Sequence, residues 1–265
     1  MKITLDEAAQ MVTDAQTVIL TSHIRPDGDS IGSTLGMMHY LRERGKDARV
    51  LIDDEIPRTF QILPGIAQIE RPTEGVRYTA DLLIVCDVEL KRTGAVLDAV
   101  DAVRVLNIDH HVTNDEEAEY LYLNPEYAAT CEIMHDLVHT MGGTFSLDAA
   151  TCLYTGMATD TGFFRFSNTT PHTMRAAADL IEIGVKPNII AVAMELKSYD
   201  EVMAQVRAIR SLEMFYDGRV AAVFIDEEKA KEVTTTEGLL DKLRVIEGTQ
   251  VVFFMKWLEK DTYRV

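Results

Sequence analysis

Short hydrophobic runs alternate with amphipathic segments along most of the chain. The runs lack polar–apolar alternation, which is typical of strands buried on both faces of a sheet, and they predict strands at 17–22, 48–52, 81–87, 103–111 and 120–123. Apolar residues at helical spacing predict helices at 5–15, 30–44, 131–141, 148–160, 173–183 and from Pro187 towards Lys197. This alternation of strand and helix favours an α/β fold with a parallel sheet and right-handed crossovers.

The pattern changes in the last third of the chain. Residues 198–206 are polar and charged and are expected to form a helical or extended linker. The segment FYDGRVAAVFI predicts a hairpin with Asp217-Gly218 at its turn, and two short helical segments and strands at 250–258 and 262–265 follow it. The sequence therefore predicts a parallel-sheet α/β domain with helices on both faces at 1–190, a linker at 191–208 and a smaller α+β domain at 209–265.

Composition narrows the classes of function. The 265 residues are 47% hydrophobic, which is enough for a large core in one domain or in two unequal ones. A formal net charge of −17 argues against a basic face that binds long nucleic acid. The negative net charge does not exclude a small phosphorylated ligand, because bound metal ions can supply the positive charge that the phosphate needs.

Cysteine use and hydropathy predict a soluble cytoplasmic protein with no membrane partner. Cys86, Cys131 and Cys152 are scattered in apolar surroundings without a CxxC pair. Buried reduced thiols are therefore expected, rather than disulfides or a thiolate zinc site. The N-terminal MKITLDEAAQ has no apolar signal core, and no apolar run approaches the roughly 20 residues that span a bilayer.

The stretch TSHIRPDGDSIGS, from Thr21 to Ser33, places three potential metal ligands between a predicted strand and a predicted helix. These are His23, Asp27 and Asp29, with a Pro-Asp-Gly turn among them. A loop of this kind can direct all three into one small volume. The alternative is a polar turn that caps the next helix, with Asp29 or Ser30 as the N-cap residue.

Further carboxylates and imidazoles follow other hydrophobic segments. Asp87 ends the run DLLIVCD, the triplet Asp109-His110-His111 ends VRVLNIDHH, and Asp160 follows a largely buried helix. Taken singly, Asp87 and Asp160 could be helix caps and the triplet a surface turn. Because the carboxyl ends of parallel strands share one edge of a sheet, where ligands bind, a shared site with His23 is favoured.

A metal centre is the chemistry that suits this set of residues. Several carboxylates packed together repel one another and cannot all remain ionised unless cations lie between them. Two divalent ions about 3.5–4 Å apart, bridged by one carboxylate, form the usual clamp for in-line displacement at phosphorus. Mixed imidazole and carboxylate ligands suit manganese, iron, cobalt or zinc better than calcium.

Four motifs together resemble those of the DHH phosphoesterase superfamily in order and approximate spacing. They are HIRPDGDSIGS, the VCD that ends at Asp87, the DHH at 109–111, and ATDTGFFRFSN at 158–168. The resemblance covers roughly residues 1–190 and is greatest to small stand-alone bacterial members. It implies a hydrolase that cleaves very short oligoribonucleotides (nanoRNA) to mononucleotides and converts 3′-phosphoadenosine 5′-phosphate to AMP.

The resemblance also implies two manganese ions as cofactors and a role for each site residue. The first ion would be held by His23 and Asp27, the second by Asp29, His110 and Asp160, and Asp87 would bridge them. A water or hydroxide between the ions would attack phosphorus. His111 would contact the scissile phosphate, and Asp109 would orient a ligand histidine.

The segment TTTEGLLDKLRVIEG, at 234–248, resembles the start of the DHHA1 domain that grips substrate in this superfamily. That domain carries a glycine-rich GGGH segment, which this chain lacks up to Val265. The resemblance therefore leads us to expect a truncated, incomplete second domain. A homodimer is implied by the resemblance alone.

Three other functions remain open. A phosphodiesterase that acts on cyclic dinucleotides or linear dinucleotides (pApA, pGpG) in second-messenger turnover shares the motifs. A manganese pyrophosphatase shares the metal residues but requires a different second domain, and a non-catalytic nucleotide-binding protein would be expected to have lost a ligand residue. The expected partners are thus short oligoribonucleotides, dinucleotides or nucleoside bisphosphates.

Overall fold

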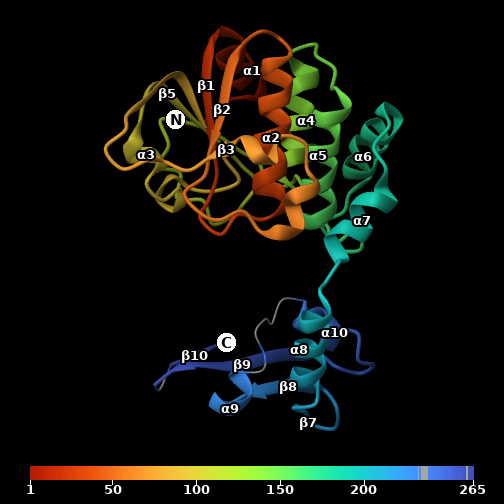
Figure 1. Cartoon of the computed structure of the whole chain (residues 1–265). Helices are drawn as coiled ribbons and strands as arrows, with labels where there is room; N and C mark the ends of the chain where they lie inside the picture. Colours follow the sequence, from red (N-terminus) through yellow and green to blue (C-terminus); the bar gives the residue numbers. More distant parts are fainter. Residues whose placement is uncertain (232, 234–237, 261) are drawn as a thin grey trace. The chain divides into compact units, whose positions relative to one another are not determined.

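The computed structural model describes all residues except 232, 234–237 and 261, so the first part of the DHHA1-like segment lies outside the described residues. The described chain forms two compact units, Met1–Glu195 and Leu196–Val265 (Figure 1). Each unit has its own sheet and hydrophobic core. Within the described ranges, no helix combines the length and the apolar character that crossing a membrane requires.

Six parallel strands form the sheet of the first unit. In spatial order they are β3 (Ile69–Glu70), β2 (Asp47–Leu51), β1 (Thr17–Thr21), β4 (Tyr78–Cys86), β5 (Val100–Asp109) and β6 (Tyr120–Leu123). The hydrophobic runs predict five of them, and the sixth, β3, has only two residues and was not predicted. The order runs outward in both directions from the β1–β4 pair, where Leu20 lies beside Ile84. In open α/β sheets, ligands bind at such a reversal, beyond the carboxyl ends of the strands.

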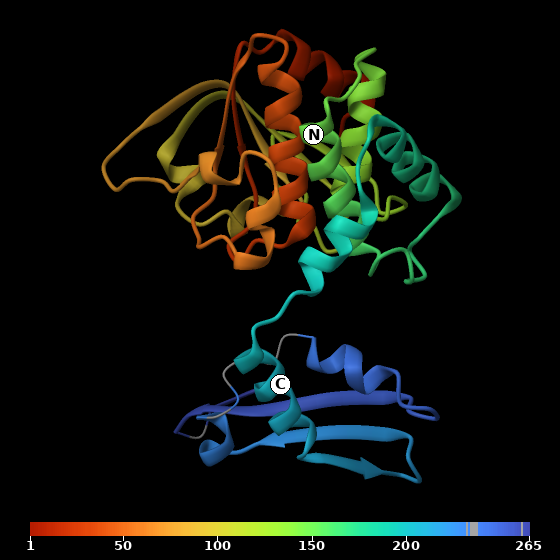
Figure 2. The same ribbon diagram turned by 45° about the vertical axis from the view of Figure 1, so that its right-hand side comes forward.

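Alternate residues of the strands pack against helices on opposite faces of this sheet. One face, which includes Leu20 and Ile84, packs under α1 (Leu5–Asp14), α2 (Gly28–Arg42), α4 (Thr130–Thr140) and α5 (Leu147–Asp160). The other face, which includes Ile19 and Leu83, packs against the shorter α3 (Val96–Ala99) and the 3₁₀ turn η3 (Leu90–Arg92). Figures 1 and 2 show α2, α4 and α5 together on one side of the sheet. The prediction of helices on both faces is confirmed.

The remaining elements of the first unit follow or connect these layers. They are η1 (Arg58–Ile62), η2 (Ile66–Gln68), α6 (Pro171–Ile183) and α7 (Pro187–Glu195). Helix α6 begins at Pro171, earlier than the apolar spacing predicts, because Thr170 caps it and proline is well suited to the first helical position. The three cysteines are buried and unpaired, as predicted.

Helix α2 also begins earlier than predicted, at Gly28. Its N-cap residue is Asp27, not Asp29 or Ser30. The Asp27 side chain accepts the Ser30 N–H at 3.0 Å, and the Ser30 hydroxyl accepts the Asp27 N–H at 2.9 Å. Asp29 is instead inside the first turn, and its side chain is directed towards α4.

Glycines allow α2 and α5 to pack with their backbones close together. A Cβ atom on Gly32 would lie 2.6 Å from the Cys152 carbonyl oxygen, and one on Gly156 would lie 3.0 Å from Cα of Asp29. Because no side chain separates the helices there, the first turn of α2 and the last turn of α5 come together at the carboxyl edge of the sheet. This contact positions two of the predicted metal ligands, Asp29 and Asp160.

The second unit contains a four-stranded sheet. In chain order its elements are α8 (Tyr199–Ile209), β7 (Leu212–Phe215), β8 (Val220–Ile225), α9 (Glu227–Ala230), α10 (Leu239–Arg244), β9 (Val251–Glu259) and β10 (Thr262–Arg264). Strands β7 and β8 pair antiparallel, which confirms the predicted hairpin, and β8 pairs parallel to β9. Most of the predicted linker, 191–208, is helical, because it includes the end of α7 and nearly all of α8.

Candidate metal centre

His23 and Asp27 lie on the loop that joins β1 to α2. Nδ1 of His23 is 3.0 Å from the Ile24 carbonyl oxygen, so this nitrogen donates to the backbone and Nε2 is the nitrogen that faces the site. Nε2 lies 3.7 Å from Oδ2 of Asp27. Because Oδ1 of Asp27 accepts the Ser30 N–H, one carboxylate oxygen caps α2 while the other faces His23.

Asp87 follows β4, beside the reversal of strand order, and its backbone is left-handed with φ at 66°. For a residue other than glycine this conformation is costly and persists only where the surroundings fix it. Here the Asp87 N–H donates to the Ile108 carbonyl at 2.9 Å, and the side chain is 2% exposed. Oδ2 lies 3.6 Å from Nε2 of His23, whereas Oδ1 lies 3.5 Å from Nε2 of His110. One buried carboxylate thus faces two histidines from different strands.

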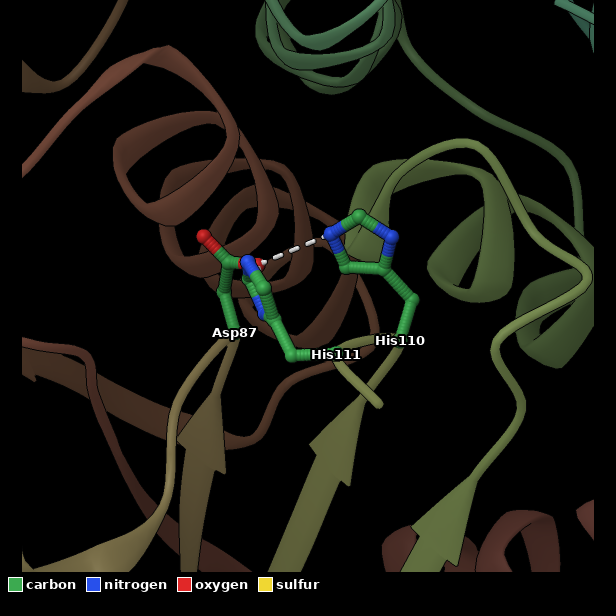
Figure 3. Close-up of side chains that lie close together, drawn as sticks. All are labelled: Asp87, His110 and His111. Carbon is green, nitrogen blue, oxygen red and sulfur yellow. Dashed lines mark ion pairs between the residues drawn. The ribbon is translucent and has the colours of Figure 1, made fainter. Parts of the chain in front are cut away.

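The triplet Asp109-His110-His111 ends β5, and its two histidines gather around Asp87 (Figure 3). Asp109 is fully buried behind them. Its Oδ1 accepts the backbone N–H groups of His110 and His111 at 2.7 and 3.1 Å, and it lies 2.8 Å from Nδ1 of His111. Asp109 therefore holds the ring of His111, whereas the prediction was that it orients a ligand histidine; it contacts His110 only through the backbone N–H.

Two asparagines that were not predicted complete this support. Nδ2 of Asn114 donates to Oδ2 of Asp109 at 2.6 Å and to Oδ1 of Asn107 at 3.0 Å. Asn107 in turn donates to the carbonyls of Val85 and Val88, at 3.0 and 2.8 Å. These bonds tie the end of β5 to the loop after β4. A polar residue inside the otherwise apolar run VRVLNID is the signal that could have identified Asn107.

His110 presents the clearest test of whether a metal ion fits. Its Nδ1 lies 3.2 Å from the Tyr127 carbonyl, while Nε2 is buried and has no hydrogen-bond partner in the part of the chain that the structure describes. Three carboxylate oxygens surround Nε2: Oδ2 of Asp160 at 3.4 Å, Oδ1 of Asp87 at 3.5 Å and Oδ2 of Asp29 at 3.8 Å. These separations are long for hydrogen bonds. Ligand atoms about 2.1 Å from a shared ion are roughly 3.0–3.4 Å apart. The observed separations are at or slightly above the upper end of this range, so a small inward shift of the carboxylates would let the group hold a cation.

Asp29 is held by the N-terminus of α4. Its Oδ2 accepts the Thr130 N–H at 2.6 Å and its Oδ1 accepts the Cys131 N–H at 2.8 Å. The Thr130 hydroxyl also donates to Oδ1 of Asp87, at 3.1 Å. A helix N-terminus favours negative charge, so α4 both fixes and stabilises the two buried carboxylates that face His110.

Asp160 is the last residue of α5, and a tight turn follows it. Gly162, Phe163 and Phe164 are all left-handed, with φ between 56° and 62°. Nδ2 of Asn168 then donates to the carbonyls of Asp160 and Ala128, at 3.2 and 3.3 Å. The turn in the ATDTGFFRFSN motif thus returns the chain to the site and fixes the end of α5.

The side chains form three overlapping groups, and within each group one ligand atom from every member lies within 4.8 Å of the others. The groups are His23 with Asp27 and Asp87, Asp29 with His110 and Asp160, and Asp87 with His110 and His111. The structure therefore brings all six predicted ligands together. Asp87 belongs to two groups, and Asp109 lies behind them.

The electrostatics of the cluster favour added positive charge. Burial opposes protonation of His23, yet the carboxylates of Asp27 and Asp87 raise its pKa to about 10. For His110 burial is again outweighed by Asp87 and the neighbouring carboxylates, and its pKa is also raised to about 10. Burial and the charge of Asp87 raise the pKa of Asp160 to about 6. The buried carboxylates thus attract protons when no other cation compensates them.

Comparison with known proteins identifies a family to which the chain belongs and several similar proteins. Residues 17–157 match the family described as DHH family, N-terminal domain. The chain is 32% identical over 245 residues to the bifunctional oligoribonuclease and PAP phosphatase NrnA of Thermus thermophilus, a match that covers 92% of this chain and 73% of the relative. It is 25% identical over 263 residues to the cyclic-di-AMP phosphodiesterase PdeA of Listeria monocytogenes, which covers 92% of this chain and 39% of that protein.

A solved structure shares the fold. An exopolyphosphatase-related protein from Bacteroides fragilis aligns with a TM-score of 0.86, over 95% of this chain and 79% of that chain. The two sequences are 24% identical over this alignment.

Proposed function

The chain belongs to the DHH family, and we propose that it is a metal-dependent phosphoesterase that hydrolyses very short oligoribonucleotides (nanoRNA) to mononucleotides and 3′-phosphoadenosine 5′-phosphate to AMP. The position of Asp87 carries the proposal, because its two carboxylate oxygens face two histidine–carboxylate groups at once. A carboxylate placed in this way suits a pair of adjacent divalent ions. The Thermus relative, which is named for both activities, supports the choice of substrates.

The proposed metal ligands follow the geometric groups. We assign one ion to His23 and Asp27, the other to Asp29, His110 and Asp160, and both to Asp87. The buried Nε2 of His110 supports the assignment, because it has carboxylates around it but no hydrogen-bond partner in the described chain. We propose manganese as the ion, since it accepts mixed imidazole and carboxylate ligands. Two ions held by these residues would supply an activated water and neutralise phosphate charge.

His111 is the residue that we propose to contact the substrate. Its side chain is 48% exposed, whereas Asp109 behind it is buried. The hydrogen bond to Asp109 raises the pKa of His111 and occupies Nδ1, so Nε2 remains available as a donor. A protonated His111 can donate to a phosphate oxygen and stabilise the charge that develops there. Asp109 is a positioning residue, because it acts through the His111 ring.

The proposed domain roles place catalysis in 1–190 and substrate binding in 209–265, with 191–208 as the linker. The acidic chain, with its net charge of −17, suits short substrates better than long nucleic acid. By analogy with the superfamily, we further propose a cytoplasmic homodimer. Light scattering on the purified chain would measure its mass and thereby test the dimer.

The alternative proposal is a phosphodiesterase of second-messenger turnover that cleaves cyclic dinucleotides or pApA and pGpG. The relative PdeA supports it, because it is named for cyclic di-AMP. That match covers 39% of the length of PdeA, compared with 73% for the Thermus relative, so it gives the weaker support.

Product analysis tests the proposal and separates it from the alternative. The chain is incubated with 5′-phosphorylated diadenylate, with 3′-phosphoadenosine 5′-phosphate and with cyclic di-AMP, each with manganese and with a chelator. Release of AMP from the first two substrates, with manganese only, is the expected result. Preferential cleavage of cyclic di-AMP, seen as formation of pApA, would favour the alternative, and no product from any of the three substrates with the metal-loaded protein would contradict both.

A further inference from the structure

A second histidine–carboxylate group lies outside the DHH centre and joins residues of α4 and α6. Figure 1 labels both helices. His135 and His139 are four residues apart on α4, so their side chains share one face of that helix. Asp179 approaches them from α6. One ligand atom from each of the three residues lies within 4.8 Å of the other two.

The ring of His135 is fixed in one orientation. Its Nδ1 lies 3.1 Å from Oδ1 of Asp136, and the ring stacks on Phe145 with the centroids 5.6 Å apart. Oδ2 of Asp136 accepts from the Tyr127 hydroxyl at 2.7 Å and lies 2.9 Å from Nε2 of His172. An ionised Asp136 accepts the Nδ1 proton of His135 and leaves a lone pair on Nε2, as carboxylates do behind metal-ligating histidines.

The separation between the His135 and Asp179 side chains is long for a hydrogen bond. Nε2 of His135 lies 3.2 Å from Nε2 of His139 and 3.5 Å from Oδ2 of Asp179. A shared cation satisfies all three groups. Ligands about 2.0–2.1 Å from a tetrahedral zinc ion are roughly 3.3 Å apart, which lies between the two observed separations.

We propose that His135, His139 and Asp179 form a zinc-type divalent-cation site that ties α4 to α6 and is separate from the DHH centre. Two imidazoles and one carboxylate are typical zinc ligands. His139 and Asp179 are exposed, so the fourth position is open to water.

The proposed site lies on the same helix that holds the DHH centre. The first residues of α4, Thr130 and Cys131, donate their N–H groups to Asp29. His135 and His139 are farther along that helix, by roughly 7 and 13 Å from Thr130 at a rise of 1.5 Å per residue. An ion at the second site therefore stabilises the helix that positions Asp29, without contacting the substrate.

Zinc content and thermal stability test this proposal. Wild type is compared with His139→Gln and Asp179→Asn, both at exposed positions where the fold tolerates the change, and with Glu182→Gln as the control. Glu182 is an exposed residue of α6 that is not in the group, and its replacement removes the same charge as Asp179→Asn. After dialysis against buffered zinc, wild type and the control are expected to hold about one ion per chain more than either test variant. Adding zinc should also raise the Tm of wild type and of the control by more than it raises the Tm of either test variant.

Nitrogen NMR of the imidazoles locates the additional ion. Zinc is expected to shift the Nε2 signals of His135 and His139 in wild type and in Glu182→Gln, and to leave them unshifted in Asp179→Asn. Equal zinc content in all four proteins would overturn the proposal. So would a loss of zinc in the control, or a difference in zinc content without a shift of the His135 signal.

Discussion

Oδ1 of Asp87 lies 3.5 Å from Nε2 of His110, and neither atom can satisfy the other by a good hydrogen bond at that distance. The other carboxylate oxygen of Asp87, Oδ2, lies 3.6 Å from Nε2 of His23, which is again too long for a good hydrogen bond. A buried carboxylate between two imidazoles is thus arranged as the centre of a larger cluster. The chemistry proposed for this protein depends on that arrangement.

Replacing Asp87 with Asn should abolish turnover without unfolding the protein. Asparagine tolerates the left-handed backbone at this position and can still accept from the Thr130 hydroxyl, so the local fold should persist. The loss of the shared ligand should lower kcat by roughly a thousand-fold or more, equivalent to several kcal/mol. Steady-state kinetics with diadenylate measures it, and circular dichroism controls for folding. Retained manganese-dependent turnover would rule out the bridging role.

Replacing Asp109 with Asn should move the alkaline limb of the pH profile to lower pH. The hydrogen bond to Asp109 raises the pKa of His111, so wild type keeps His111 protonated above its ordinary value of 6.5. Without that carboxylate the pKa returns towards 6.5, and the protonated donor is lost at a lower pH. The dependence of kcat/KM on pH measures the shift, with His111→Gln as the reference that lacks the limb. If the pH profile of Asp109→Asn is unchanged, His111 does not act as a protonated donor whose pKa is set by Asp109.

Metal-free protein should become less stable as the pH rises above neutrality. In that state the pKa values of His23 and His110 are raised from 6.5 to about 10. The folded protein binds more protons than the unfolded chain between these values, so this contribution to stability is complete below pH 6.5 and is lost as the pH approaches 10.

Manganese replaces those protons, and its stabilising effect should therefore grow with pH. Tm is measured from pH 6 to pH 8.5 with chelator and with manganese. A difference in Tm that widens with pH is expected. A difference that stays constant over this range would contradict the proposed competition between protons and metal.

Replacing Gly156 with Ala should destabilise the junction of α2, α4 and α5. The added Cβ would lie 3.0 Å from Cα of Asp29 and would also clash with Sγ of Cys131. Overpacking of this kind typically costs roughly 1–3 kcal/mol of unfolding free energy, which urea denaturation measures. Cys131→Ala should recover part of the loss in the double variant. A double variant as unstable as the sum of the two single changes would show that Cys131 is not the obstacle.

Five of the six strands of the first unit could be predicted because buried parallel strands carry an unbroken apolar signal, whereas β3 has only two half-buried residues and carries none. The same signal predicted where Asp87 and the triplet at 109–111 lie, since residues that end parallel strands meet at one edge. The N-cap of α2 could not be fixed in this way. Asp29 and Ser30 have the same local capping tendency as Asp27, and the choice is settled by the distant N–H groups of α4 that bind Asp29.

Other parts of the structure depend on contacts between residues that are far apart in the sequence or on elements too short to show a pattern. Helix α3 is too short to show a helical period, and the strand after it begins before the apolar run becomes continuous. Asn114 supports Asp109 only because the loop after β5 folds back. His135 and His139 share a helix face that the sequence shows, but Asp179 joins them only through the packing of α6 against α4.

The central claim is that Asp87 is shared by two cations, and anomalous X-ray scattering from crystals grown with manganese tests it most directly. Two manganese peaks are expected, one between Asp87 and the His23–Asp27 pair and one between Asp87 and the group of Asp29, His110 and Asp160. A single peak that does not contact Asp87, or two peaks that both lie away from it, would contradict the account.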